Sequence, residues 1–170
     1  TVAHINDEIQ SAGAIEFINV CEDRISRQLV ELGQLIEDDI HNVRLICVAG
    51  PSSSGKTTFA NRLRIELLSR GIRPIRISID DYYKRGDDIP NGEDGKPDYE
   101  ALNALDIDFF NQNMLDLING EATDLPKFDF QKGQRVVGRR VKLNPEEPII
   151  IEGIHALNDK LTTAIPQNAK

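Results

Sequence analysis

The sequence predicts an α/β fold with a parallel sheet, helices on both faces, a β-hairpin insertion and an N-terminal helical extension. Three apolar runs rich in β-branched residues have the length and composition of buried strands: 43–49, 75–79 and 148–152. Two segments of helical period lie between them: 56–69 and 108–118. Strands that alternate with helices in this order form a parallel sheet, because each helix carries the chain back to begin the next strand.

The ends of these strands are where we expect chemistry, because ligands of such sheets bind outside the carboxyl ends of the strands. The first strand runs into a glycine-rich turn at Gly50, the second ends near Asp80, and the third closes on Glu152. If the alternation of the second strand continues, Asp80 points to the side opposite Ile79.

The helical segments have recognisable boundaries. Gly71 suits a C-cap for the helix at 56–69, and Pro74 prevents the helix from continuing. Residues 14–40 repeat isoleucine and leucine at spacings of three, four and seven, which predicts another helix. Its other faces are acidic, so we expect a packing or connecting helix and not a membrane-surface helix, which favours a basic face. The chain thus divides into a helical connector, 1–42, and a core, 43–170.

Two irregular segments interrupt the core. Residues 84–98 are polar, rich in turn residues and longer than an ordinary connection, which is typical of a mobile functional loop. Further on, Phe128 and Phe130 precede a short loop, and residues 135–143 have the composition of a returning strand. This pattern predicts a β-hairpin, with Gly138 as a bend or turn.

Composition and charge exclude several classes of protein. The 170 residues are 39% hydrophobic and 28% charged, which excludes a mainly disordered chain. No run of about 18 apolar residues is present to span a membrane. The net charge of −8 argues against nucleic acid as the main partner. Two cysteines, Cys21 and Cys47, lie far apart without metal-type spacing, so we expect a reduced, cytoplasmic location.

The strongest motif is Gly-Pro-Ser-Ser-Ser-Gly-Lys-Thr at 50–57, which matches the phosphate-binding loop G-x-x-x-x-G-K-[ST]. It lies between a predicted strand and a predicted helix, which is the context the motif requires. Its glycines let backbone N–H groups wrap a phosphate, and the helix directs its positive end at the same group. Lys56 would reach the β- and γ-phosphates, and Thr57 would place its hydroxyl on Mg²⁺. We assign ATP binding to Gly50, Ser52, Ser53, Ser54, Gly55, Lys56, Thr57 and Thr58.

Carboxylates follow the other two strands. Asp80, with Asp81 beside it, is placed to accept a proton from an attacking hydroxyl, as a kinase requires. The alternative for either aspartate is a capping role at a turn or helix, and spacing alone does not tell which of the two acts. Glu152 lies where proteins with this phosphate-binding loop often hold the metal, although Asp is the commoner residue there. The alternative role for the Glu152 carboxylate is a purely structural contact.

Several further residues have both functional and structural interpretations. His155 follows Glu152 closely and so lies near the same strand ends, but a lone histidine is more often a structural hydrogen-bonding group. Tyr82 and Tyr83 could contact a ring or simply pack. The hairpin arginines are more often solvated than bound to a ligand: Arg135, Arg139 and Arg140.

Four motifs in order resemble the uridine kinase and phosphoribulokinase family: 50–58, Ser-Ile-Asp-Asp-Tyr-Tyr at 78–83, Phe-Asp-Phe at 128–130, and Ile-Glu-Gly-Ile-His at 151–155. The resemblance runs from about Val43 to Ala164. It implies ATP-dependent phosphorylation of a hydroxyl on a nucleoside or sugar. It places the catalytic base at Asp80, the Mg²⁺-side acid at Glu152, an acceptor-contacting aromatic at Tyr83, and a ribose-holding acid near Glu100.

The resemblance also has departures. Uridine kinases of the family carry Tyr at the position of Phe128 and His at that of Gly133, so uridine is not assigned as the acceptor. The family continues beyond Pro166 with a further core strand and an arginine-bearing lid. The chain resembles bacterial uridine-kinase-like proteins whose core follows a threonyl-tRNA-synthetase-like region. We therefore expect a piece of a longer protein, with a C-terminally incomplete core that binds nucleotide better than it turns it over.

Taken together, the residues favour a small-molecule kinase that uses ATP and Mg²⁺. We assign catalysis to Asp80 and Lys56 and the metal to Thr57 and Glu152. Acceptor contacts are assigned to a further set: Asp80, Tyr83, Glu100, Phe128, Arg135 and His155. The alternative is an ATP-binding regulatory module without metabolite kinase activity. The partner is a small-molecule acceptor and neither nucleic acid nor membrane; whether the protein forms homo-oligomers is left open.

Overall fold

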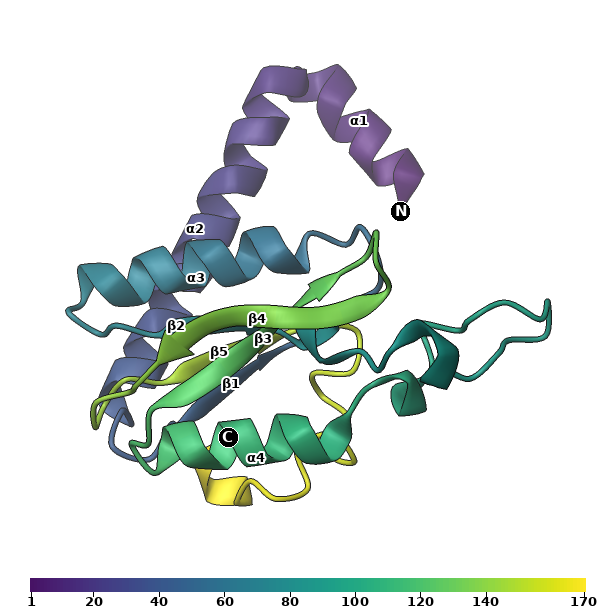
Figure 1. Cartoon of the computed structure of the whole chain (residues 1–170). Helices are drawn as coiled ribbons and strands as arrows, with labels where there is room; N and C mark the ends of the chain where they lie inside the picture. The colour runs from purple at the N-terminus through teal and green to yellow at the C-terminus, as the bar shows by residue number, and fades with distance from the viewer.

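The centre of the molecule is a three-stranded parallel sheet. In a computed structural model, which describes residues 1–170 apart from the side chain of Ala12, the strands lie in the order β1 (Leu45–Val48), β5 (Ile149–Glu152), β2 (Ile75–Ser78). Cys47 and Ile77 both lie opposite Ile151. The predicted α/β fold with a parallel sheet is confirmed, and the last strand in the chain occupies the middle of this sheet (Figure 1).

Helices cover both faces of the sheet, because successive side chains of the buried central strand point to opposite sides. Ile150 packs with α3 (Lys56–Ser69) and α2 (Ala14–Asp38). Ile149 and Ile151 pack on the other face with α4 (Ile107–Ile118) and the β-hairpin. All four residues of β5 are buried, as expected for a strand covered on both faces.

The predicted hairpin is present as β3 (Thr123–Asp129) and β4 (Gln134–Val141), paired antiparallel. Gly138 is not at a turn, which corrects the expectation from the sequence. It lies within β4 opposite a register shift between Asp124 and Pro126. A Cβ on Gly138 would lie 2.5 Å from the carbonyl oxygen of Leu125, so glycine lets the two strands approach closely at the bulge.

The N-terminal extension consists of two helices, where the sequence pattern predicted one. α1 (Val2–Ala12) is capped by the Thr1 hydroxyl, and Gly13, at φ 87°, separates it from α2. Figure 1 shows α1 and the start of α2 projecting from the body of the molecule. The expected apolar stripe therefore packs only in part: Ile15 is 78% exposed, whereas Ile36 is buried. No helix among the described residues is long and apolar enough to cross a membrane.

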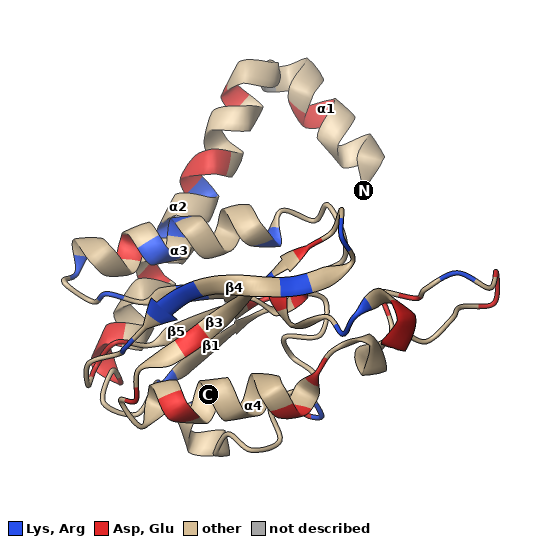
Figure 2. Ribbon diagram, viewed as in Figure 1, with Lys and Arg blue, Asp and Glu red and all other residues tan. Residues whose placement is uncertain are grey.

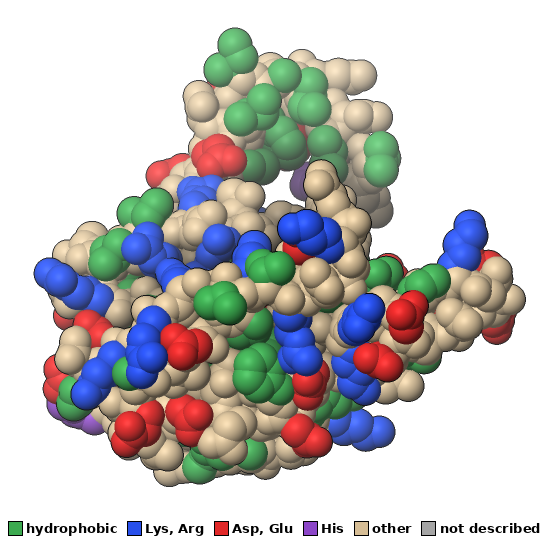
Figure 3. All heavy atoms as spheres, in the orientation of Figure 1, with side chains coloured by type: hydrophobic (Ala, Val, Ile, Leu, Met, Phe, Trp, Pro, Cys, Tyr) green, Lys and Arg blue, Asp and Glu red, His purple; other side chains and the backbone are tan. Residues whose placement is uncertain are grey.

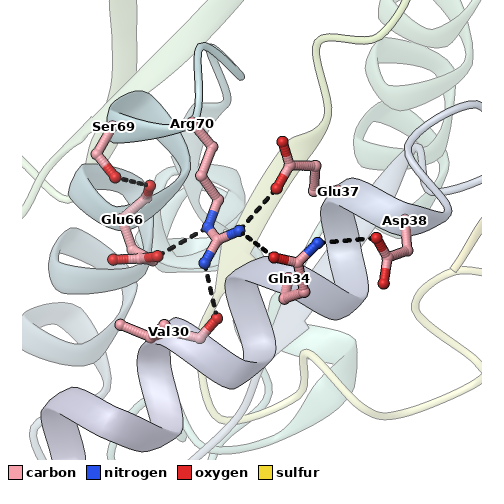
Figure 4. Close-up of polar contacts among 7 residues, drawn as sticks. All are labelled: Val30, Gln34, Glu37, Asp38, Glu66, Ser69 and Arg70. Carbon is pink, nitrogen blue, oxygen red and sulfur yellow. Dashed lines mark hydrogen bonds and ion pairs between the residues drawn. The ribbon is translucent and has the colours of Figure 1, made fainter.

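Arg70, the C-cap residue of α3, fastens this helix to α2 (Figure 4). Its guanidinium donates to Glu66 on its own helix at 2.8 Å and to Glu37 on α2 at 2.7 Å. It also donates to the Gln34 side chain at 2.9 Å and to the Val30 carbonyl at 3.0 Å. The hydrogen bonds that Arg70 donates to Glu66 and then to Glu37 raise its pKa. A single side chain thereby holds the C-terminal half of α2 against the helix that follows the phosphate loop.

The second strand ends earlier than the sequence pattern indicated. β2 stops at Ser78, and the next four residues form a 3₁₀ helix, η1 (Ile79–Tyr82). The expectation that strand alternation orients Asp80 is therefore wrong, because Asp80 lies in this tight turn. The polar loop that follows contains η2 (Gly86–Asp88), a bridge between Asn91 and Pro97, and leads to η3 (Leu102–Ala104).

Candidate active site

The loop between β1 and α3 has the conformation of an anion cradle. Ser53 and Gly55 have φ values of 60° and 84°, which turn successive backbone N–H groups toward one side. A Cβ on Gly50 would lie 2.5 Å from the Ser54 Oγ, so a larger residue at this position would force the Ser54 hydroxyl to move. No side chain caps the N-terminus of α3, so its first N–H groups are free to bind an anion.

Lys56 and Thr57 begin α3 at the edge of this cradle. The Lys56 Nζ lies 3.4 Å from the Pro51 carbonyl, folded back over the loop. The Thr57 hydroxyl donates to Glu152 Oε2 at 3.1 Å, joining residues 95 positions apart in the chain. The structure thus brings together the two residues that the sequence assigned to the metal.

Glu152 is buried, with 5% of its surface exposed, and lies between the ends of the two outer strands, opposite Val48 and Ser78. The next residue, Gly153, makes a close approach possible. A Cβ on Gly153 would lie 2.9 Å from the Cβ of Ile79, a separation that two such atoms do not adopt. Glycine at this position therefore lets η1 rest against the end of β5, beside Glu152.

Asp80 lies on η1, near enough to Lys56 of the phosphate loop for that charge to act on its carboxyl. Burial is the main cause that raises the pKa of this carboxyl, and the negative charge of Glu152 raises it further. The ammonium group of Lys56 acts in the opposite direction and lowers the pKa. Asp80 is therefore a partly buried carboxylate on which the charges of both the loop lysine and the strand-end glutamate act.

Asp81, its neighbour, has a structural role. One carboxylate oxygen accepts a hydrogen bond from the backbone N–H of Phe128 at 3.1 Å and lies 3.0 Å from the Lys127 Nζ. These contacts attach η1 to β3. The two aspartates that the sequence could not separate thus differ in surroundings: Asp81 is held by the hairpin, and Asp80 lies near the charge of Lys56.

An aromatic cluster lies next to Asp80. Tyr83 packs edge-on against Phe128, with ring centroids 5.6 Å apart, and against Tyr99, at 5.0 Å. The Tyr83 hydroxyl donates to the Tyr99 carbonyl at 2.8 Å. Burial is the main cause that raises the pKa of Tyr83, followed by the charge of Asp80. Phe128 is almost fully buried, whereas Phe130, in the same cluster, is 62% exposed and forms its outer side.

Glu100 and His155 meet at the same side of the site. The His155 Nε2 lies 2.8 Å from the Glu100 carbonyl oxygen, so the turn after β5 holds the segment that follows the polar loop. The Glu100 side chain itself is exposed, and its charge contributes to the raised pKa of Tyr83. Among the predicted acceptor residues, Asp80, Tyr83, Phe128 and this pair therefore lie in one neighbourhood.

Arg135 already makes contacts with other residues. Its guanidinium lies 2.9 Å from Asp106 and 4.9 Å from the centre of the Phe109 ring. Tyr82, whose pKa burial raises to about 12, also packs against Phe109. Arg135 thus lies on the Tyr82 side of η1, whereas the acceptor candidates surround Tyr83. Arg135 also lies opposite Phe128 in the hairpin register, and its contact with an acceptor stays a prediction.

The residues present fit a nucleoside triphosphate with Mg²⁺. The cradle offers backbone N–H donors and an uncapped helix, which suit phosphate oxygens. Thr57 and Glu152 offer one hydroxyl and one carboxylate. Among the described residues, no group of three or more His, Cys, Asp or Glu side chains is assembled to hold a metal ion. Such a small protein ligand set suits Mg²⁺, which commonly takes its remaining ligands from phosphates and water.

Two contributors were not found from the sequence. Gly153 sets the distance between η1 and β5, but a glycine after a strand predicts only a turn. Tyr99 fixes the Tyr83 hydroxyl through its carbonyl, and the only sequence signal was an aromatic residue in an otherwise polar loop.

The chain is similar to known kinases in sequence. The model of the phosphoribulokinase / uridine kinase family matches residues 45–167. A uridine kinase of Staphylococcus haemolyticus is 33% identical over 119 residues, which cover 70% of this chain and 56% of that protein. Uridine-cytidine kinase C of Dictyostelium discoideum is 32% identical over 120 residues, which cover 71% and 25%. The chain therefore spans about a quarter to somewhat more than half of these relatives.

Solved structures show the same fold. A possible uridine kinase from Bacillus stearothermophilus aligns with a TM-score of 0.62 over 82% of this chain and 77% of that chain, at 20% identity. A fructose transport system kinase from Silicibacter aligns with a TM-score of 0.55 over 74% and 62%, also at 20% identity. These likenesses establish the fold, and the sequence match establishes the family. The chain belongs to the phosphoribulokinase / uridine kinase family.

Proposed function

We propose that this protein transfers the γ-phosphoryl group of ATP to a hydroxyl of a nucleoside or sugar-like molecule. The observation that carries the proposal is the position of Asp80, which lies near enough to Lys56 and Glu152 for their charges to act on its carboxyl and lacks the hairpin contacts that occupy Asp81. A module that only binds ATP has little need of a carboxylate in this place. The relatives named as uridine and uridine-cytidine kinases support the same class of acceptor.

Each residue of the site has a part in the proposed reaction. The N–H groups of the cradle and Lys56 bind the ATP phosphates and offset the charge that builds up during transfer. Thr57 and Glu152 would hold Mg²⁺, which neutralises charge on the β- and γ-phosphates when it is bound. Asp80 accepts the proton of the acceptor hydroxyl and orients its oxygen toward the γ-phosphorus.

The surroundings of Asp80 suit a base. Burial and the nearby Glu152 raise its pKa, so the carboxylate binds a proton more readily than an exposed aspartate does. The charge of Lys56 acts in the opposite direction and limits this rise in the pKa of Asp80. Tyr83 and Phe128 line the side from which an acceptor would approach, while Glu100 and His155 border it.

The acceptor can be identified by ADP release from Mg²⁺-ATP with the natural full-length protein. The panel holds nucleosides, ribulose 5-phosphate and pantothenate, and each is tested against a blank without acceptor. We expect one class to stimulate ADP release and to yield a phosphorylated product by mass spectrometry. Lys56→Ala and Asp80→Asn should both lose this stimulation.

The regulatory alternative predicts a different result. If ATP binds with Lys56-dependent affinity but no acceptor raises turnover above the blank, the kinase proposal fails for this panel. An ATP-binding module would then be the better description. Nucleotide affinity must therefore be measured on the same protein samples, by titration with a non-hydrolysable ATP analogue.

A further inference from the structure

A cleft of about 600 Å³ lies on the outer side of β2, between α3 and the hairpin. This volume is in the range of small-molecule sites. Its floor is the unpaired edge of β2, from Pro74 to Ser78, and β4 and part of β3 form its other side. Of the described residues that line it, none belongs to the phosphate loop, and Asp81 is the residue that borders both this cleft and the site described above.

The cleft is basic in a protein that is acidic as a whole. Four cationic side chains line it: Arg64, Arg76, Lys127 and Arg139. Asp81 is the acidic residue in the lining, and it already pairs with Lys127 at 3.0 Å. The chain carries a net charge of −8, and the acidic residues of the N-terminal helices lie elsewhere in the molecule (Figure 2).

The three arginines of the cleft lack carboxylate partners. Within the described residues, no carboxylate lies within ion-pair distance of Arg64, Arg76 or Arg139. Elsewhere, Arg62 and Arg70 are paired with carboxylates, whereas four other arginines also lack an ion pair among the described residues: Arg24, Arg44, Arg73 and Arg85. Unpaired arginines that converge from α3, β2 and β4 create a local positive potential, which attracts anions.

Arg76 carries the most specific signal. Its Nη1 is buried and has no hydrogen-bond partner. A buried donor without a partner is unfavourable, particularly on a charged group. Arg139 approaches the same residue and donates from Nη2 to the Arg76 carbonyl at 2.7 Å, which brings a second positive side chain to the β2 edge. An anion bound in the cleft would accept a hydrogen bond from the unpaired donor. Its negative charge would also offset the two neighbouring positive charges.

The remainder of the lining is apolar. Ile75, Leu125, Pro126 and two valines of β4 contribute side chains to it, and Val137 is 93% exposed. Figure 3 shows hydrophobic side chains on this face with Lys and Arg side chains around them. Arginines suit a phosphate group, because their planar guanidinium binds two of its oxygens at once. The apolar surface suits a ring or other apolar body attached to that group.

We propose that this cleft binds a small organic phosphate, with Arg76 and Arg139 holding the phosphate group and the valine side of β4 contacting an apolar or aromatic body. Inorganic phosphate shares part of this chemistry, so the test has to separate the two. The proposal does not depend on kinase activity, because it involves neither the phosphate loop nor Asp80.

The test is an NMR titration of the whole chain carrying Lys56→Ala, which weakens phosphate binding at the loop. Phenyl phosphate, inorganic phosphate and phenol are titrated separately at low salt. We expect saturable shifts of the Arg76, Gly138 and Arg139 amide signals with phenyl phosphate, and binding about tenfold weaker for inorganic phosphate. Phenol alone should not saturate.

Arg139→Gln is the decisive variant, because this residue is exposed and glutamine keeps a polar side chain there, and Arg140→Gln is its matched control. Arg140 is the next residue on the same strand but pairs with Asp124 instead. We expect Arg139→Gln and Arg76→Gln to weaken phenyl phosphate binding about tenfold and Arg140→Gln by less than about twofold. The proposal is overturned if phenyl phosphate does not bind, if its shifts are confined to residues 50–58, or if Arg140→Gln weakens binding as much as Arg139→Gln.

Discussion

Replacing Gly153 by alanine tests how the fold positions the candidate base. The added Cβ would lie 2.9 Å from the Ile79 Cβ and 3.1 Å from its Cδ1. The Ile79 Cβ is bonded directly to the backbone, and no change of rotamer can move it. Either β5 or η1 must therefore shift. Overpacking of this kind costs about 1–3 kcal/mol. In a chain of this size we expect the melting temperature to fall by about 2–12 °C.

The displacement would also affect the site. Asp80 follows Ile79 directly, and Glu152 precedes Gly153, so a shift of η1 changes the separation of the two carboxylates. We therefore expect Gly153→Ala to lower acceptor-stimulated turnover even at temperatures where the protein is folded. Nucleotide affinity should change less, because the phosphate loop is not in contact with the added methyl group.

Thermal unfolding followed by circular dichroism measures the first effect, and ADP release measures the second. Gly86→Ala is the matched control, because a Cβ there would meet only a carbonyl oxygen at 3.7 Å. If Gly153→Ala melts within about 1 °C of the wild type and retains full turnover, the close approach of η1 to β5 does not position Asp80.

Four further predictions concern charges. Burial and a neighbouring carboxylate raise the pKa of Asp80 in the folded state, so the protein loses stability as the pH rises through that raised pKa. Asp80→Asn should therefore melt at or above the wild-type temperature at pH 7, while its turnover is lost. Wild-type turnover should decline on the acid side with an inflection above the ordinary pKa of 3.8, whereas an inflection below it would contradict the burial of this group. Asp81→Ala, which removes the contacts to Lys127 and the hairpin, should cost about 1–3 kcal/mol of unfolding free energy in urea and leave that acid limb in place. Arg70→Gln should speed amide hydrogen exchange across α2, whereas Arg27→Gln, which breaks an exposed pair, should not.

Local patterns sufficed for most of the fold. The helix at 56–69 was predicted with the bounds it has in the structure, because a helical repeat and its stop signals both lie in the local sequence. The strands were located within a few residues for the same reason. The prediction failed where two distant segments decide the geometry: Gly138 lies within a strand because β3 bulges opposite it.

The same distinction applies to the site. The phosphate loop is contiguous, so its motif was readable directly. The different environments of Asp80 and Asp81 could not be predicted from the local sequence. They depend on Phe128, which lies 47 residues after Asp81, and on the close approach at Gly153. The placement of Arg135 beside Asp106 is likewise a tertiary contact that no local spacing indicates.

The paired aspartates provide the most direct measurement. Turnover is compared for Asp80→Asn and Asp81→Asn in the natural full-length protein, with the stimulating acceptor and saturating Mg²⁺-ATP. If Asp80 is the base, Asp80→Asn lowers kcat by about 10²–10⁴-fold with ATP affinity unchanged, and Asp81→Asn lowers it far less. If Asp80→Asn retains kcat within a few-fold of the wild type, or if both variants lose activity equally while folded, Asp80 is not the catalytic base.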